Sequence, residues 1–343
     1  MKTAVIAITK HGQAIARKLE GDRYISAKFR TEEPARYFDK PIKELTAEIW
    51  PHYEALVYVV SLGAVVRTIA PYLKDKHVDP AVIVVDDKAQ YAISVLSGHV
   101  GGANELTEKI AGVLGAQALI TTASDVGKTI PVDILGRELG WTTEQNENIT
   151  KVSAAVVNEE PIAFVQETGE KTWWKRETPL PKNIRITTLA DAKDSKAVLL
   201  VTDRLMEDPI LERAVVYRPK SLVLGIGCDR GITCAQLDEF VQGTLREHRL
   251  SFKSVRNVAT VDVKEDEVGL QEFCRKHQLG LVCYTSDQLR EINAPNPSAT
   301  VEKYVGTPGV SEPAAMLSSG GDLIVPKQKT PMMTLAVARV RYA

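Results

Sequence analysis

The sequence predicts an α/β protein: two domains rich in parallel sheet, joined by a small middle α/β region. In both the first and the last part of the chain, apolar β-branched segments alternate with amphipathic helical segments. Strands that are apolar throughout are typical of parallel sheets covered on both faces. The 343 residues, 44% of them apolar and 25% charged, are enough for two or three domain cores.

The first region, residues 1–141, shows the alternation most clearly. Strands are expected over 3–9, 55–60, 81–85, 91–96 and 118–122. Helices are expected over 13–20, from the turn Ser61-Leu62-Gly63 to Ile69, over 103–114 and over 132–139. Because strands and helices take turns, the region is predicted to form one domain with a mostly parallel sheet.

The middle region, residues 142–219, is more polar and has a proline-rich stretch over 178–181. Short strands are expected over 162–165, 184–187 and 197–201, in a small α/β insert or linker domain.

A second strong pattern fills residues 220–343. Strands are expected over 222–226, 258–263, 280–284, 322–325 and 333–341. Helices are expected over 234–248, 269–277 and 312–317, with a further helix after Ser298. The last region is therefore predicted to be another α/β domain.

Composition excludes several classes of function. The net charge of −1 gives no general attraction to nucleic acid or to an anionic membrane. The four cysteines form no CxxC pair, so buried free thiols are expected and no metal site is predicted. No apolar stretch approaches the ~20 residues of a membrane-spanning helix, and we expect a soluble cytoplasmic protein.

Three polar loops of the first region are candidates for a ligand site. They are 61–67, with Gly63 and Arg67; 97–104, with Ser97, Gly98, Gly101, Gly102 and Asn104; and 121–128, with Thr121, Thr122 and Lys128. Each follows an expected strand, and ligands of open α/β sheets bind beyond the carboxyl ends of strands. Each loop alone is also compatible with an ordinary capped turn.

His99 is the sharpest single candidate, because it lies between glycines in one of these loops. An imidazole there can act as general acid or base, with Asp125 to orient it or to act in its place. A surface histidine that stabilises a turn remains the alternative. The flanking residues do not match GxSxG, which argues against a serine nucleophile.

A glycine-rich loop over 225–231 resembles a dinucleotide-binding fingerprint only superficially. Its third glycine comes one position late, so a nicotinamide cofactor is weakly supported. We interpret the loop as an anion-accepting turn in which Gly227 permits close approach and Arg230 offers a bidentate guanidinium.

Longer motifs reveal a family resemblance. The segments VR-x-IAP-x-L, K-x-x-DPAV-x-VVD, LSGH-x-GGAN and ITTA-x-D occur in this order between Val66 and Asp125. They resemble the amino-terminal domain of the CbiG family, the cobalt-precorrin-5A hydrolases of anaerobic cobalamin biosynthesis. The segments LGIGCDRG, APNPS over 294–298, GVSEPAA over 309–315 and TLAVARV resemble that family's carboxyl-terminal domain, which it shares with CobE-type proteins.

The resemblance implies the reaction. The substrate would be a cobalt-bearing, ring-contracted tetrapyrrole with a δ-lactone, which water opens before a two-carbon unit leaves as acetaldehyde to give cobalt-precorrin-5B. No cofactor is expected on the protein, because the cobalt arrives with the substrate. The main partner would be this small molecule, with a homodimer or transient contact with neighbouring pathway enzymes left open.

The resemblance also suggests roles for the candidate residues. His99 is the first choice for base and acid, and Asp125 the second. The backbone amides of Gly63, Gly101 and Gly102 would bind an oxyanion or carboxylate, and Arg67, Lys128 and Arg230 would pair with acetate and propionate groups. The other substrate contacts would be Ser97, Gly98, Asn104, Thr121, Thr122 and Gly227.

Two other functions stay open at this point. One is a non-catalytic corrinoid-binding or handover protein, and the other is a nucleotide-dependent oxidoreductase. The sequence also leaves open whether the site lies within the first domain or in a cleft between the first and last domains. We favour the cleft, because a corrinoid is broad and both domains offer loops rich in hydrogen-bond donors.

Overall fold

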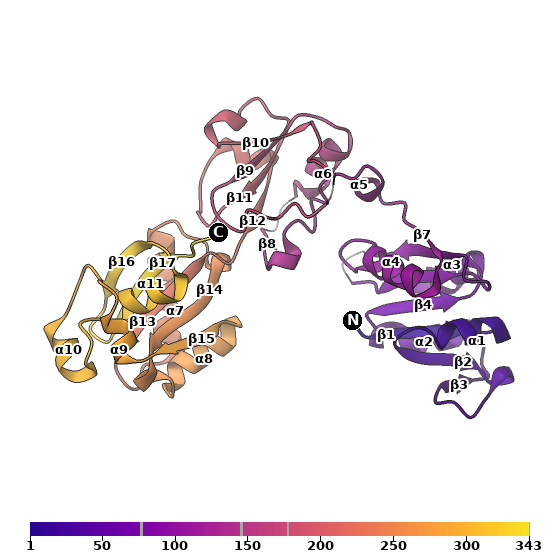
Figure 1. Cartoon of the computed structure of the whole chain (residues 1–343), viewed down its shortest axis with the longest axis horizontal. Helices are drawn as coiled ribbons and strands as arrows, with labels where there is room; N and C mark the ends of the chain where they lie inside the picture. The colour runs from indigo at the N-terminus through magenta and orange to yellow at the C-terminus, as the bar shows by residue number, and fades with distance from the viewer. Residues whose placement is uncertain (76–77, 145–146, 177, 343) are drawn as a thin grey trace. The chain divides into compact units, whose positions relative to one another are not determined.

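The computed structural model describes residues 1–75, 78–144, 147–176 and 178–342 (Figure 1). The chain divides into two compact units, Met1–Ile134 and Leu135–Ala343. The described strands form one seven-stranded sheet in the first unit and two five-stranded sheets in the second. The predicted α/β class with parallel-rich sheets is confirmed, whereas the domain boundaries at 141/142 and 219/220 stay a prediction.

The first unit alternates strands and helices. Its strands are β1 (Thr3–Ala7), β2 (Asp22–Ser26), β3 (Arg36–Phe38), β4 (Ala55–Val59), β5 (Ala81–Val85), β6 (Tyr91–Leu96) and β7 (Gln117–Leu119). Its helices are α1 (Lys10–Ala16), α2 (Ile42–Ile49), α3 (Leu62–Ile69), α4 (Ala103–Leu114) and α5 (Ala123–Val126).

The strand order of the first sheet is β3-β2-β1-β4-β5-β6-β7. All neighbours are parallel except β5 and β6, which are joined by a tight turn and run antiparallel. Strands β6 and β7 therefore point opposite to the other five. As a result, the loops after β6 and β7 lie at the edge where β1, β4 and β5 begin.

Both faces of this sheet are buried, as its apolar strands predict. Alternate residues of β4 belong to different cores: Val57 packs with α1 and α4 residues such as Ile15 and Ile110. Its neighbour Leu56 packs with α2 and α3 residues such as Leu45. The period-2 alternation of a strand thus explains why every residue of β4 is apolar.

Several predicted boundaries in the first unit are wrong. Residues 10–12, between the expected strand 3–9 and the expected helix 13–20, form the first turn of α1, because the Thr9 hydroxyl accepts the Gly12 N–H and caps the helix there. Gly63 lies in the first turn of α3 rather than in a turn before it. Strand β7 ends at Leu119, and Asp125 lies in the short helix α5 instead of at a strand end.

The helix expected over 132–139 does not form. Gly136 adopts a left-handed backbone (φ 72°), and a Cβ there would meet the Trp141 ring at 2.1 Å. The chain therefore turns at Gly136, and only the 3₁₀ turn Arg137–Leu139 remains helical.

The second unit contains two sheets. The first of them has the order β10-β9-β11-β12-β8, made of β8 (Thr142–Thr143), β9 (Ile162–Gln166), β10 (Ile184–Thr187), β11 (Ala197–Val201) and β12 (Ala214–Arg218). It is accompanied by α6 (Ile149–Val157). The three expected strands are confirmed, while β8, β12 and α6 were not predicted.

The other sheet has the order β15-β14-β13-β17-β16. Its strands are β13 (Leu222–Cys228), β14 (Val255–Val261), β15 (Gly280–Tyr284), β16 (Leu323–Lys329) and β17 (Met333–Arg339). Its helices are α7 (Cys234–Glu247), α8 (Val268–His277), α9 (Ser286–Arg290), α10 (Ala299–Val305) and α11 (Ser311–Ser319). Helices α7 and α8 cover one face, and α9 and α11 cover the other.

Two features of this sheet differ from the prediction. Strands β13, β14 and β15 are parallel, but β17 runs antiparallel to both β13 and β16. Gly227 and Cys228 belong to β13 and pair with Thr334 and Met333 of β17, so they are not part of a loop. Within the described residues, no helix is both long and apolar enough to cross a membrane.

Candidate active site

The loop between β6 and α4 holds His99 in a fixed position. Ser97 has a left-handed backbone (φ 56°), and its carbonyl accepts the Ala103 N–H. The Gly102 N–H is donated to the His99 carbonyl at 3.0 Å. A Cβ on Gly101 would lie 2.4 Å from the Ser97 Cβ, so the loop needs glycine at this position to close.

The His99 ring lies between two carboxylates. Its Nδ1 is 3.2 Å from Asp133 Oδ1, and its Nε2 is 2.9 Å from Asp125 Oδ2. The Ser124 hydroxyl is 3.1 Å from the same Nε2. The His99 side chain is only 13% exposed, so both ring nitrogens face protein groups in a largely desolvated place.

Asn104 joins this ring to the neighbouring strand and helix. Its Nδ2 donates to Asp125 Oδ2 at 2.7 Å and to Thr122 Oγ1 at 2.9 Å. Its Oδ1 accepts the Ser94 hydroxyl at 2.6 Å. Asp125 is therefore oriented by both His99 and Asn104. We call His99, Asn104, Ser124, Asp125 and Asp133 the His99 cluster.

The surroundings favour the protonated ring. The pKa of His99 is raised, first by the hydrogen bond to Asp133 and further by Asp125, while burial opposes the rise. A carboxylate on each side stabilises an imidazolium, which is the form that donates a proton. The arrangement suits general acid catalysis, followed by base catalysis once the proton has been given away.

Ser124, His99 and Asp133 also have the order of a nucleophile, a base and an orienting carboxylate. Ser124, however, is only 6% exposed and shares Nε2 with Asp125. Ser97, the other serine near His99, donates instead to the Asp79 carbonyl at 2.9 Å. The geometry therefore favours proton transfer by His99 over attack by a serine.

The structure brings several predicted residues to this cluster. Ser97, Gly98, Gly101, Gly102 and Asn104 form the loop and helix start around His99. Thr122 precedes α5 and accepts from Asn104, and Lys128 follows α5 with its backbone N–H on the Asp125 carbonyl. Thr121 is exposed one residue before Thr122.

Gly63 and Arg67 lie elsewhere. They belong to α3, which follows β4, and β4 points opposite to β6. They are therefore at the other edge of the sheet from His99. The structure therefore brings the 97–104 and 121–128 loops together but not the 61–67 loop, because β6 runs antiparallel to β5.

The backbone donors predicted for an oxyanion are also partly engaged. The Gly102 N–H already binds the His99 carbonyl. Within the described residues no acceptor is found for the Gly101 N–H. Of these two glycines, Gly101 is thus the better candidate.

Gly227 and Arg230 lie in the second unit, where the predicted anion-accepting turn binds carboxylates of the chain itself. The Gly231 N–H donates to Glu267 at 2.9 Å, and Arg230 pairs with Asp266 and donates to the Val263 carbonyl. Thr233 and Gln236 form a capping box that occupies the first turn of α7. A buried acid and a capped helix start leave little room for a dinucleotide phosphate, which argues against the oxidoreductase alternative.

Sequence reasoning missed Asp133 and Ser124. Asp133 lies 34 residues after His99, in a segment that was expected to be helical, so no local pattern connected the two. Ser124 is adjacent to Asp125 inside the ITTA-x-D segment. It is the unspecified position of that segment, so only its place in the 121–128 loop pointed to it.

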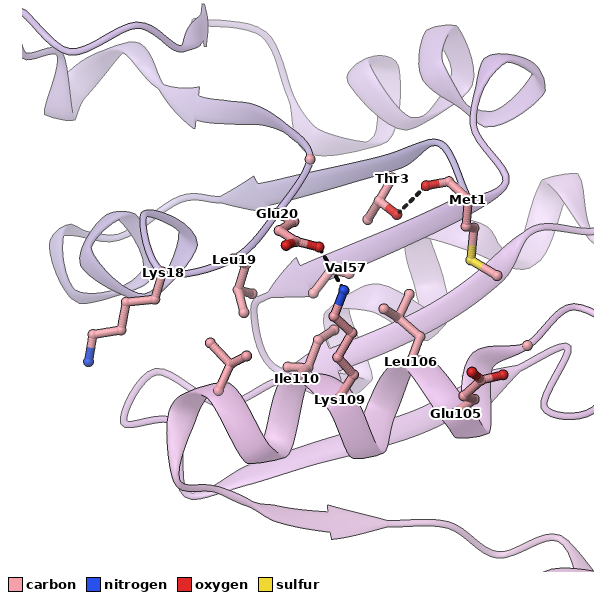
Figure 2. A pocket seen from close by; sticks show the side chains of 13 residues that line it. Met1, Thr3, Lys18, Leu19, Glu20, Val57, Glu105, Leu106, Lys109 and Ile110 are labelled. Atoms are coloured by element: carbon pink, nitrogen blue, oxygen red, sulfur yellow. Dashed lines mark hydrogen bonds and ion pairs between the residues drawn. The ribbon is translucent and has the colours of Figure 1, made fainter. Parts of the chain in front are cut away.

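A pocket of about 400 Å³ lies beside α4 (Figure 2). Leu19, Leu106 and Ile110 contribute apolar walls, and Lys109 reaches across to Glu20 at 2.7 Å. Gly102 is the one residue of the 97–102 loop that lines it, and no member of the His99 cluster does. The pocket therefore adjoins the loop but does not contain the reactive ring.

No group of three or more His, Cys, Asp or Glu side chains within the described part of the chain is arranged to hold a metal ion. The cysteines are free thiols: Cys274 is buried, and Cys228, Cys234 and Cys283 are half-buried.

Comparison with known proteins gives a consistent result along the whole chain. Family profiles described as cobalamin synthesis G N-terminal, cobalamin biosynthesis central region and cobalamin synthesis G C-terminus match residues 44–125, 130–219 and 222–338. A Priestia megaterium protein named cobalt-precorrin-5A hydrolase is 48% identical over 99% of this chain and 95% of its own length. A Salmonella typhimurium protein of the same name is 32% identical over 98% of this chain and 97% of its own.

Proposed function

The chain belongs to the cobalamin synthesis G (CbiG) family, and we propose that it hydrolyses cobalt-precorrin-5A in cobalamin biosynthesis. The observation that carries the proposal is similarity over the full length to relatives that bear this name. The His99 cluster supports it, because hydrolysis of this kind needs positioned groups that give and take protons.

The proposed reaction has two steps. Water adds to the lactone carbonyl, and the carbon–oxygen bond of the lactone breaks to leave a carboxylate and a hydroxyl. The hydroxyl then loses its proton, the adjacent carbon–carbon bond breaks, and acetaldehyde leaves while the electron pair passes into the macrocycle.

The His99 cluster offers a group for each proton. Asp125, whose side chain is 30% exposed, takes a proton from the attacking water. The His99 imidazolium donates to the lactone oxygen as it leaves. The neutral imidazole then accepts the hydroxyl proton during fragmentation, which regenerates the charged ring.

The experiment is acetaldehyde release from anaerobic cobalt-precorrin-5A, followed with a coupled alcohol dehydrogenase. Wild-type protein should release acetaldehyde, and His99→Ala should reduce the rate by about 10²–10⁴-fold, the usual contribution of a general acid–base group. His11→Ala is the matched control, because His11 also pairs with an aspartate, Asp87, but at the surface.

The outcomes separate the alternatives. Release that is equal in wild type and His99→Ala would keep the hydrolase and move the chemistry away from His99. Binding of substrate without release by wild type would favour a corrinoid carrier. Ser124→Ala tests covalent catalysis: a loss as large as that of His99→Ala would make Ser124 the nucleophile.

A further inference from the structure

The second unit contains a pocket of about 760 Å³ at the carboxyl ends of β13 and β14. Three of the carboxyl-terminal motifs meet in it: Gly227 to Arg230, Asn296 to Ser298, and Gly309 to Pro313. The turn between β16 and β17 closes another side. A pocket at this edge of a parallel sheet has the usual position of a ligand site, and its volume lies within the ~300–1,000 Å³ of small-molecule pockets.

The walls combine apolar surface with positive charge. Val261, Val301, Val305 and Val310 contribute aliphatic side chains. The Cys228 thiol belongs to the same wall, and its burial raises its pKa to about 11, so it stays neutral. This wall therefore offers an uncharged surface to a flat apolar ligand.

Four cationic side chains line the pocket. Arg230 is paired with Asp266 and Glu267, and the Lys327 ammonium donates to the Asn296 carbonyl. Lys264 and Lys329 make no ion pair with any described residue. Arg230 and three lysines, two of them outside any ion pair with a described residue, outnumber the acids Asp229 and Glu312 of the same lining, which indicates a local preference for an anionic ligand.

A buried carboxylate holds the pocket walls together. Glu312, which is 2% exposed, accepts the Asn296 N–H at 2.9 Å, the Asn296 side-chain amide at 2.8 Å and the Lys327 N–H at 2.9 Å. These bonds tie the 293–298 loop and β16 to the start of α11. Since its oxygens already accept these hydrogen bonds, Glu312 shapes the pocket and offers no free oxygen to a ligand.

The pocket also contains an unsatisfied donor. Ser311 lines it, is 1% exposed, and its hydroxyl has no hydrogen-bond partner among the described residues. Ser311 and Glu312 begin α11, and the first N–H groups of a helix have no acceptor within the helix. A carboxylate of a ligand is the group that would satisfy both kinds of donor.

We infer that this pocket binds a corrinoid through its peripheral carboxylates, with the macrocycle on the aliphatic wall and acetate or propionate groups on Lys264, Lys329 and the α11 start. The choice of a corrinoid over other polycarboxylates rests on the proposed function. The inference that the pocket binds a carboxylate ligand rests on its lining residues alone.

The test uses the full chain and cobyrinic acid, a corrinoid whose peripheral acids are free, with binding measured by calorimetry. The variant Lys264→Gln/Lys329→Gln should bind it about tenfold more weakly, since each exposed ion pair contributes modestly. The variant should also lose most of the salt dependence of binding. Cobinamide, in which these carboxyls are amides, should bind wild type more weakly and should not distinguish it from the variant.

Lys276→Gln is the matched control, because Lys276 is an exposed lysine of α8 in the same unit that pairs with Asp238 and does not line the pocket. It should bind cobyrinic acid like wild type. Thermal melting of the double variant should be unchanged, because Lys264 and Lys329 make no ion pair with a described residue that the variant would lose.

The inference is overturned if cobyrinic acid does not bind, or binds wild type and the double variant equally. Lysine-dependent binding of NADP⁺ in place of cobyrinic acid would also overturn it. Acetaldehyde release, measured on the same preparations, separates the two proposals. Release without lysine-dependent binding leaves only the hydrolase, and lysine-dependent binding without release leaves only the pocket.

Discussion

The His99 cluster and the pocket of the second unit use their charged groups in opposite ways. In the cluster, His99 has a carboxylate or hydroxyl at each ring nitrogen, and Asp125 accepts from both His99 and Asn104. In the pocket, Lys264 and Lys329 form no ion pair with a described residue, and the Ser311 hydroxyl has no hydrogen-bond partner within the described chain. Groups that are already oriented suit proton transfer, whereas groups that lack partners suit the binding of a ligand that supplies them.

The two regions also lie at different edges of their sheets. The pocket is at the carboxyl ends of β13 and β14, where α/β folds usually bind ligands. The cluster is at the edge where β1 and β4 begin, because β6 and β7 are reversed. The rule that ligands bind at the carboxyl ends of the parallel strands therefore predicts the position of the pocket but not that of the His99 cluster. The difference arises because β6 runs antiparallel to β5.

Among the variants that test this comparison, Asp125→Asn should have the largest effect on acetaldehyde release. If the cluster transfers protons and the pocket binds, acetaldehyde release should fall about 100-fold, while the affinity for cobyrinic acid should stay within about twofold. Asp87→Asn, in the exposed His11–Asp87 pair, should change neither. If Asp125→Asn lowered turnover and the affinity for cobyrinic acid together, proton transfer and ligand binding would not be separate roles of the two regions.

Gly101→Ala should have the next largest effect. Its new Cβ would meet the Ser97 Cβ at 2.4 Å and the Ser97 carbonyl at 2.8 Å, which forces the loop to move and destabilises it by about 1–3 kcal/mol. Turnover should fall about tenfold as His99 is displaced. Gly112→Ala is the control: a Cβ there meets nothing within 4 Å, so thermal melting should show an unchanged or slightly stabilised helix with normal activity.

Asp133→Asn should sharpen the assignment of His99 through pH. Asp133 is the main cause of the raised His99 pKa, so its removal should move the His99 limb of the pH–rate profile to lower pH. A raised pKa stabilises the fold below the ordinary pKa of histidine, about 6.5, and this contribution disappears as pH rises through the folded-state pKa. The stability difference between wild type and Asp133→Asn should therefore be larger in acid.

Imidazole NMR titration of His99 and denaturation across pH check this prediction. Asp87→Asn is again the control for a general effect of removing a carboxylate from a histidine. A pH–rate profile that does not move in Asp133→Asn would mean that another group sets the limb.

The smallest effect is expected for Arg67→Ala. Arg67 is exposed on α3 at the opposite edge from His99, so its loss should change turnover by less than about twofold. Steady-state kinetics with cobalt-precorrin-5A measures it. A clear rise in KM with unchanged kcat would instead show that the substrate reaches this edge, as the sequence prediction for Arg67 and Gly63 requires.

Much of the fold could be predicted because strands that are buried on both faces consist of continuous apolar residues, which are easy to recognise in the sequence. Strands β5, β6, β10, β11 and β15 and helix α4 have the predicted bounds. Helices without such a pattern were predicted less well: α5 is only four residues long, and the expected helix over 132–139 is broken by Gly136.

The candidate site was predicted only in part, because its contacts are long-range. His99 and Asp125 stood out through their local composition, and the structure places them 2.9 Å apart. Asp133 did not stand out, since nothing near it in the sequence indicates a histidine 34 residues away. Arg230 showed the opposite limit. The glycine-rich loop around it suggested a guanidinium free to bind an anion, but that guanidinium already pairs with Asp266.

Glu312 has one more consequence, for the thermodynamics of association. Because it fastens a loop, a strand and a helix start during folding, the conformational entropy of these segments is lost before any ligand arrives. A preorganised cavity of this kind gives an affinity that is not reduced by ordering of its walls. Binding of cobyrinic acid should accordingly show a heat-capacity change that reflects the buried apolar area, without the larger signature of coupled folding.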